Sequence, residues 1–375
     1  MVDVPAAEGS GEPYLSSVGD TVWMSWLEPA DGDLWALRLV SIVDGAAGAV
    51  STVVERSDFF VNWADFPAVS RLEDGRLAAH WLQRGGTSTY DYGVRVSWSG
   101  DGGATWSDPL TPHEDGTPTE HGFASHLPGA GGAVGLVWLD GRENELGEEG
   151  APTTAMTLRF RGLDGPGAAG PEVLLDDRVC DCCQTGAAET RDGWVVVYRD
   201  RSEDEIRDIY STRLVDGAWT QGRPVHRDGW HIAGCPVNGP AVAALDERVA
   251  TAWFTGAGEV PRVSLAFSED QGATFGEPIG IDAGDPIGRV DVILDERGAL
   301  VSWLERSGEE AELRLSRIGF DGVVESTITV AEVASARASG FPRMVESAGD
   351  LVFAWTDAKD DMTRIQVARM EGGAQ

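Results

Sequence analysis

The chain has 375 residues, of which 42% are hydrophobic and 24% charged, a composition typical of a globular protein. Its 62 acidic and 29 basic residues give a formal net charge of −33, so its surface repels phosphate backbones and anionic lipids. We therefore expect no nucleic-acid partner. We also expect no membrane insertion, because no apolar run reaches the ~18 residues of a membrane span.

The chain begins with "MVDVPAAEGSGEP", which lacks the basic and apolar regions of a signal peptide. Either the protein is cytosolic or a leader has been removed from this sequence. The strong negative charge suits an exterior compartment, so we expect a secreted or periplasmic protein, and a monomer. The four cysteines fit disulfides in an oxidising compartment, or a metal site or reactive thiol in a reducing one.

Seven segments along the chain share a strand pattern centred on one aromatic residue. These residues are Trp26, Trp81, Trp138, Tyr198, Trp253, Trp303 and Trp355. Their spacing of 50 to 60 residues is typical of a solenoid or a propeller. A short strand such as "PAVSRL" and a turn precede the aromatic strand. A third alternating strand such as "YGVRVSWS" and a weaker fourth follow it.

Four antiparallel strands per repeat are typical of a propeller blade. The sequence therefore predicts an all-β protein in which residues 1–375 form a single β-propeller domain of seven four-stranded blades. Six blades plus a hairpin is the alternative. The last repeat stops after its third strand at Met370, so the N-terminal "VDVPAA" is predicted to supply the missing outer strand and close the ring.

Two turns carry a sharper signal, S-x-D-x-G-x-T followed by an aromatic residue, between the third and fourth strands of their repeats. In such a hairpin turn the Asp accepts backbone N–H bonds, the Gly takes a positive φ and the aromatic ring packs the turn onto the blade. We interpret both turns as structural. Their residues are Ser99, Asp101, Gly103, Thr105 and Trp106 in the first, and Ser268, Asp270, Gly272, Thr274 and Phe275 in the second.

These turns resemble the Asp box of the sialidase superfamily, and the propeller repeats extend the resemblance over nearly the whole chain, to a secreted bacterial member. The resemblance implies structural Asp boxes. It also implies a site with an arginine triad for a substrate carboxylate, a tyrosine nucleophile with a glutamate partner, and an aspartate acid/base. The sequence lacks the family's Arg-Ile-Pro motif, "FPRM" at 341–344 does not replace it, and no Tyr/Glu pair is recognisable. We therefore expect ordinary sialidase activity to be absent.

The cysteines lie in the loops that lead into the innermost strands. In a propeller these loops, here called the mouth loops, surround the axial channel on a face that commonly binds ligands. "VCDCCQT" places Cys180, Cys182 and Cys183 at blade four, and "HIAGCPVNG" places Cys235 at blade five. Along an extended segment Cys180 and Cys182 point the same way and Cys183 the other way. We expect Cys180, Cys182 and Cys235 to converge.

His121 and His231 lie in the mouth loops of blades three and five, so each is a candidate for a further ligand. Two or three thiolates with an imidazole suit a soft metal ion, copper more than zinc. The alternative is one or two disulfides that pin the channel mouth, since C-x-C-C is not a standard zinc spacing.

Charged residues after the aromatic strands are candidates for catalysis. Asp200 occupies the position two residues after the aromatic, which holds an acid in most repeats, and this recurrence favours a structural role. Arg199 and Arg201 flank it and are candidates for holding an anionic substrate, with salt bridges to nearby acids as the alternative. Tyr90, in the loop 84–93 on the same face, is a further candidate.

The sequence leads to two functional classes. The crowded thiols favour a metal- or thiol-centred enzyme or metal-binding propeller, with a small molecule or glycan as its ligand at the axial mouth. The alternative is a glycan-binding or glycoside-hydrolysing propeller whose cysteines form structural disulfides. A scaffold for a protein partner fits any propeller.

Overall fold

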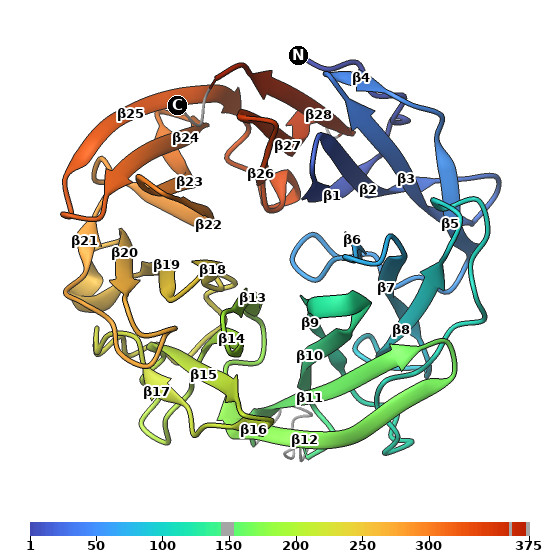
Figure 1. Cartoon of the computed structure of the whole chain (residues 1–375), viewed down its shortest axis with the longest axis horizontal. Helices are drawn as coiled ribbons and strands as arrows, with labels where there is room; N and C mark the ends of the chain where they lie inside the picture. Colours follow the sequence, from blue (N-terminus) through green and yellow to red (C-terminus); the bar gives the residue numbers. More distant parts are fainter. Residues whose placement is uncertain (144–153, 360–361, 373–375) are drawn as a thin grey trace.

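Seven β-sheets radiate from a common axis in the computed structural model, which describes residues 1–143, 154–359 and 362–372 (Figure 1). Each sheet is one blade, and its strands follow one another from the axis outward in sequence order. The first strands of neighbouring blades contact each other around the ring. The predicted all-β fold with seven blades is confirmed, and the six-blade alternative is wrong.

Blades one to three contain the first twelve strands. Blade one consists of β1 (Gly11–Val18), β2 (Thr21–Pro29), β3 (Trp35–Val43), β4 (Ala46–Ala47) and β5 (Ser51–Arg56). Blade two consists of β6 (Ala68–Arg71), β7 (Leu77–Arg84) and β8 (Tyr92–Ser99). Blade three consists of β9 (His121–Pro128), β10 (Val134–Asp140), β11 (Met156–Gly165) and β12 (Ala168–Val179).

Blades four to seven complete the ring. Blade four consists of β13 (Gly186–Thr190), β14 (Gly193–Arg199), β15 (Ile209–Val215), β16 (Ala218–Trp219) and β17 (Arg223–Pro224). Blade five consists of β18 (Ala241–Leu245), β19 (Arg248–Thr255), β20 (Arg262–Ser268) and β21 (Ile279–Gly280). Blade six consists of β22 (Pro286–Asp295), β23 (Gly298–Ser307), β24 (Glu310–Gly319) and β25 (Val324–Val333). Blade seven consists of β26 (Arg343–Ser347), β27 (Asp350–Lys359) and β28 (Met362–Met370).

The helical content of the described residues is three single turns of 3₁₀ helix, η1 (Ala130–Gly132), η2 (Ala257–Glu259) and η3 (Arg337–Ser339). No helix in this part of the chain has the length and apolar character needed to cross a membrane.

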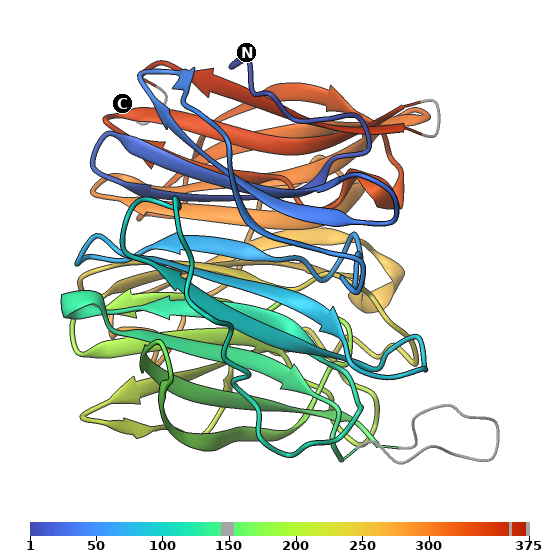
Figure 2. The same ribbon diagram turned by 90° about the vertical axis from the view of Figure 1, so that its right-hand side faces the viewer.

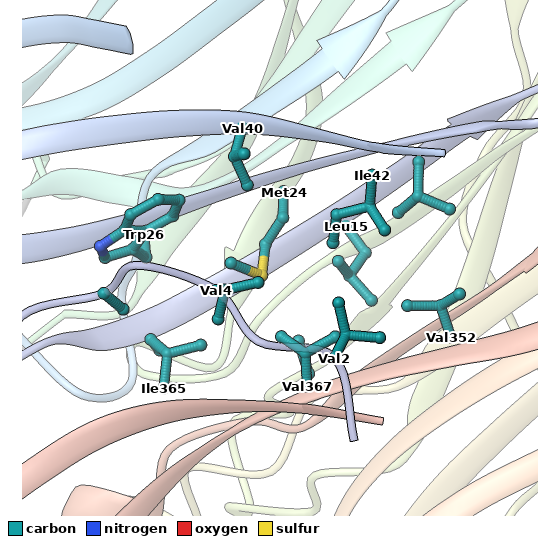
Figure 3. Packing of buried hydrophobic residues seen from close by; sticks show 13 residues of the cluster. Val2, Val4, Leu15, Met24, Trp26, Val40, Ile42, Val352, Ile365 and Val367 are labelled. Atoms are coloured by element: carbon teal, nitrogen blue, oxygen red, sulfur yellow. The ribbon is translucent and has the colours of Figure 1, made fainter. Parts of the chain in front are cut away.

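The N-terminal segment closes the ring. The backbone N–H of Val2 donates to the carbonyl of Val367 on β28 at 2.8 Å, and the two residues form an antiparallel bridge. Figure 2 shows this segment beside the last strands of the chain. Val2 and Val4 pack into one apolar cluster with Met24 of blade one and Val367 of blade seven (Figure 3). The predicted closure by "VDVPAA" is therefore confirmed.

In blades one, three and six the acid after the aromatic position accepts a hydrogen bond from the indole N–H of its own blade, which satisfies a polar group buried in the core. The donor–acceptor pairs are Trp26–Glu28 at 2.8 Å, Trp138–Asp140 at 2.8 Å and Trp303–Glu305 at 2.6 Å. Trp81, whose strand carries Gln83 in that position, has a buried indole N–H without a partner among the described residues. The recurrence is thus architectural in these blades.

The two S-x-D-x-G-x-T turns form the same hydrogen bonds. The hydroxyl of Ser99 lies 2.8 Å from an Asp101 oxygen and accepts the N–H of Gly103, and Asp101 accepts the N–H and hydroxyl of Thr105. The second turn repeats each bond with the residues of 268–274. Gly103 has a φ of 88°, as the turn requires.

Candidate functional site

A pocket of about 420 Å³ opens where the mouth loops meet, and it is lined by residues of blades two to seven. A second cavity of about 130 Å³ lies among the innermost strands. The two cavities share Ala64, Asp65 and Phe123 in their walls. The pocket therefore stands at one end of the axial channel, here called the axial pocket.

Side chains of the mouth loops fix each loop to the next blade. In each case a side-chain oxygen of one blade accepts a backbone N–H of the following blade, so the loops around the axis form a linked series. The bonds run from Phe123 to Asp65 at 2.8 Å, from Gly239 to Gln184 at 3.2 Å, from Arg289 to Asn238 at 2.7 Å and from Met344 to Asp291 at 2.8 Å.

Two carboxyl groups meet at one phenol in the wall of the axial pocket. The hydroxyl oxygen of Tyr92 lies 2.7 Å from Asp65 Oδ2 and 2.8 Å from Glu120 Oε1. A phenol has a single proton to donate, so the second short contact requires a proton on one of the carboxyl groups. The three side chains, here called the acid pair and its tyrosine, thus hold at least one carboxyl proton.

The electrostatics of the acid pair agree with this proton count. Burial raises the pKa of Asp65 to about 7, against the opposing hydrogen bond from Tyr92. Burial, together with the charge of Asp65, raises the pKa of Glu120 to about 8. Burial also raises the pKa of Tyr92 well above its usual value. Such values place proton uptake and release by the two carboxyl groups close to neutral pH.

Glycine at position 122 makes the close approach of these groups possible. A Cβ at Gly122 would lie 2.0 Å from Asp65 Oδ2 and 2.8 Å from the hydroxyl of Tyr92. The Tyr92 ring is itself held by Phe60, which stacks on it at a centroid distance of 3.8 Å. Packing therefore fixes the phenol between the two carboxyl groups.

Arg289 and Arg337 line the axial pocket on the side of blades six and seven. Neither has a carboxylate partner in the described part of the chain. Arg289 is buried, its guanidinium group donates to the carbonyls of Ala336 and Gly340, and that group lies 5.0 Å above the ring of Trp63. Burial, with the nearby charge of Arg337, lowers the pKa of Arg289 to about 10. A buried cation without a counter-charge favours an anionic group in the pocket.

Three of the four cysteines converge beside this pocket. Cys180 Sγ lies 3.3 Å from Cys183 Sγ and 4.0 Å from Cys182 Sγ. Cys182 and Cys235 both line the pocket, and the two thiols interact with each other. All four cysteines are free, so the structure contains none of the disulfides that the sequence left open.

The expectation that Cys183 points away from Cys180 is wrong. Residues 181 and 182 form a turn, so the side chains do not alternate as they would along an extended strand. The turn brings the buried Cys183 back to the side of Cys180 and leaves Cys182 at the pocket.

Arginines surround the buried end of the cluster. Arg207 Nη1 lies 3.2 Å from Cys180 Sγ, and Arg207 Nη2 pairs with Glu205 at 2.8 Å. Burial acts to raise the pKa of the Cys180 thiol. Hydrogen bonds from Cys182 and Cys183 and the charge of Arg207 outweigh burial and hold that pKa well below its usual value. Arg207 and the neighbouring thiols thus favour the thiolate form of the buried Cys180.

The histidines predicted as further ligands lie elsewhere. His121 Nε2 lies 3.1 Å from Asp115 Oδ1 and 3.6 Å from Asp140 Oδ2, and its ring stacks on His113 at 3.8 Å. His113, Asp115 and His121 together form a second group of metal-ligand type, but Asp140 is already paired with an arginine there. His231 is exposed, and its backbone forms a bridge with Ile206.

The four catalytic candidates from the sequence are dispersed. Arg199 is buried and donates to three backbone carbonyls, and Arg201 pairs with Asp181 and Glu205. The half-buried Asp200 has its pKa raised to about 7 by burial and by a neighbouring acid. Tyr90 is exposed and is the one of the four that lines the axial pocket.

Sequence reasoning missed Asp65, Tyr92, Glu120, Arg289 and Arg337. The mouth loops "NWADF" and "TEHGF" contain both acids, but nothing in a linear pattern joins them to a tyrosine on another strand. Tyr92 and Glu120 are 28 residues apart and belong to different blades. The signal that could have found them is the presence of an acid in two consecutive mouth loops.

Comparisons with known proteins are informative at the level of the fold. No protein-family model and no curated protein sequence matches the chain. Among solved structures, an ulvan lyase of polysaccharide lyase family PL25 aligns with a TM-score of 0.64 and 12% identity over 98% of this chain and 95% of the lyase.

Two other enzymes align over most of their length. The sialidase NanB from Streptococcus pneumoniae, as a K499G mutant, gives a TM-score of 0.54 at 10% identity over 94% of this chain and 83% of NanB. A GH93 α-L-arabinofuranosidase of Fusarium graminearum gives 0.53 at 14% identity over 82% and 92%. The chain therefore has the fold of the sialidase-like propellers.

Proposed function

We propose that the axial pocket cleaves a glycosidic bond of an anionic glycan by acid–base chemistry. The observation that carries this proposal is the Tyr92 hydroxyl between Asp65 and Glu120, a unit that holds and exchanges a proton near neutral pH. The fold supports it, because the aligned structures include a polysaccharide lyase, a sialidase and an arabinofuranosidase.

The residues of the pocket divide into two roles. The acid pair and its tyrosine supply and accept protons at the scissile bond. Arg289 and Arg337 bind the acidic group of the sugar, which in turn neutralises their charge. Because the sugar-binding cations belong to blades six and seven and the acid pair to blades two and three, the substrate lies across the axis.

Incubation with a panel of uronate-containing polysaccharides tests the proposal. New reducing ends alone indicate hydrolysis, and new reducing ends with the ultraviolet absorbance of an unsaturated uronate indicate elimination. Tyr92→Phe should lower the rate by about 10²- to 10⁴-fold while the protein stays folded. Wild-type protein that neither binds nor cleaves any member of the panel would overturn the proposal. Release of sialic acid is not expected, since the Arg-Ile-Pro motif is absent.

A second candidate function is the binding of a soft metal ion by the cysteines, with copper favoured and zinc as the alternative. The observation that favours it is the short separation of three free sulfur atoms, 3.3 Å and 4.0 Å from Cys180 Sγ, beside a cation that stabilises thiolate. Anaerobic titration of reduced protein with copper(I) and with zinc(II), combined with a free-thiol count, tests this function. Reduced protein that binds neither ion would rule it out.

A further inference from the structure

We propose that Cys180, Cys182 and Cys183 form a three-sulfur cradle for the metal ion, and that Cys235 is a displaceable fourth ligand on the side of the axial pocket. The inference rests on the metal-binding function proposed above. It assigns to the ion an open coordination position that a small molecule in the pocket can take.

The cradle is complete within one mouth loop. Its three sulfur atoms lie within 4.8 Å of one another, and all belong to the short segment between β12 and β13. Thiolates at ~2.3 Å from one tetrahedral ion lie about 3.8 Å apart, so the observed separations need little adjustment. Cys180 and Cys183 are buried, and packing therefore holds two of the three sulfur atoms in place.

The charges around the cradle favour a ligand set of thiolates. Arg207 lies 3.2 Å from Cys180 Sγ. Arg199 sits on the neighbouring strand, where its backbone carbonyl accepts the N–H of Cys180 at 2.9 Å. Within the described residues Arg199 has carbonyl partners but no carboxylate, so a buried positive charge next to the loop is left for the sulfur atoms to balance.

Cys235 differs from the cysteines of the cradle in its exposure, its blade and its backbone hydrogen bonding. It is exposed, and it belongs to blade five instead of blade four. Its backbone forms no hydrogen bond to any other described residue, whereas Gly239 in the same loop is bound to Gln184. A side chain on such a segment can leave a metal ion at little cost in structure.

The pocket supplies the space for an exchange. Cys182 and Cys235 both border the axial pocket, so an ion bound to them faces that pocket and Glu120. Three protein ligands with an open fourth position are typical of metal sites that bind or activate small molecules, whereas closed four-ligand sites are structural. The cradle and the acid pair would then act on one and the same bound molecule.

Cobalt(II) is a suitable probe, because its absorption reports both the number of thiolates and the coordination number. Reduced wild-type protein, Cys235→Ala and Cys182→Ala are each loaded with cobalt(II) and titrated with imidazole. We expect Cys235→Ala to keep the ion, with weaker thiolate charge-transfer absorption, and to show a new imidazole adduct. Cys182→Ala should lose affinity by ~100-fold or more.

The outcomes separate this inference from the functions on which it depends. If wild-type protein binds cobalt(II) but Cys235→Ala binds it as poorly as Cys182→Ala, Cys235 is an obligatory ligand and the inference is wrong, while metal binding stands. If wild-type protein binds no cobalt(II), copper(I) or zinc(II), metal binding itself fails. Circular dichroism and thermal unfolding of the apo variants show whether each is folded, and Cys235→Ser provides a second variant if Cys235→Ala is not.

Discussion

The hydroxyl of Tyr92 contacts two carboxyl groups but has one proton to donate. Because a carboxyl group must hold a further proton, the contacts at the mouth of the channel depend on pH. At the scale of single residues the pocket is built from groups that water would normally solvate: Asp65, Glu120 and Arg289, each buried or nearly so. Ionisable groups with strongly shifted pKa values that line a pocket mark a candidate functional site, because their burial costs desolvation free energy.

Stability should fall between about pH 4, where the two carboxyl groups titrate in the unfolded chain, and about pH 8. Burial raises the folded-state pKa of Asp65 to about 7 and of Glu120 to about 8, so the folded protein binds more protons than the unfolded chain. The stabilisation linked to these protons is present at low pH and is lost as the pH rises through 7 and 8. Urea denaturation at a series of pH values measures this slope. An Asp65→Asn, Glu120→Gln double variant should reduce it, and an equal slope in both proteins would contradict the assignment.

Gly122→Ala should damage the acid pair directly. The added Cβ would lie 2.0 Å from Asp65 Oδ2, so the carboxyl group must move away from Tyr92. We expect a loss of about 1–3 kcal/mol in stability, measured by urea denaturation, because the site is overpacked. Gly85→Ala, with nothing within 4 Å of the added Cβ, is the matched control and should change stability little. Similar losses in both variants would count against a tight fit at position 122.

At the scale of the structural element, each blade is organised around its aromatic strand. Four of the seven central aromatics are tryptophans without measurable exposure, Trp26, Trp138, Trp253 and Trp303. In three of these blades the acid two residues later accepts the indole N–H, so one strand carries both the core ring and its polar partner. This local pairing explains why the acid recurs without a catalytic role.

Trp303→Ala should cost ~3–5 kcal/mol in the free energy of unfolding, because it leaves a cavity in blade six and removes the indole N–H that Glu305 accepts. Chemical denaturation measures the loss. Val324→Ala on the exposed edge strand β25 of the same blade is the control and should stay within about 0.5 kcal/mol of wild type. A loss below ~1 kcal/mol for Trp303→Ala would mean that the ring is not part of the core.

At the scale of the whole molecule, the ring is closed by pairing the first residues with the last strand. The closure joins residues more than 360 positions apart, since Val2 bonds to Val367. The N-terminal segment then packs on both blade one and blade seven, as Figure 3 shows. A segment of a few residues therefore closes the ring.

Deletion of residues 2–9 should lower the thermal stability of the entire protein rather than of one blade. The deletion removes the buried Val2 and Val4 and exposes the apolar residues that pack against them, and the lost apolar burial is worth about 3 kcal/mol or more. Scanning calorimetry measures the midpoint and its cooperativity. Asp3→Ala changes the exposed face of the same segment and should have no such effect. An unchanged midpoint after the deletion would show that the closure is dispensable.

The sequence by itself determined the features that repeat or that depend on neighbours in the chain. The aromatic spacing predicted seven blades, the unfinished last repeat predicted the closure, and the mouth-loop positions predicted that Cys180 and Cys182 come together near the axis. The first two inferences succeed because strand alternation and blade order are local rules that every repeat follows, and the third succeeds because blade order puts the two cysteines in one mouth loop.

Tertiary structure decided the contacts at the candidate site that depend on one loop's conformation or on residues far apart in the sequence. A turn at residues 181 and 182 sends Cys183 back to Cys180, against the alternation expected for an extended strand. Tyr92 meets Asp65 and Glu120 only because two blades adjoin at the axis and Gly122 leaves room for them. Such contacts depend on side-chain packing between segments far apart in sequence, and no periodic pattern encodes that packing.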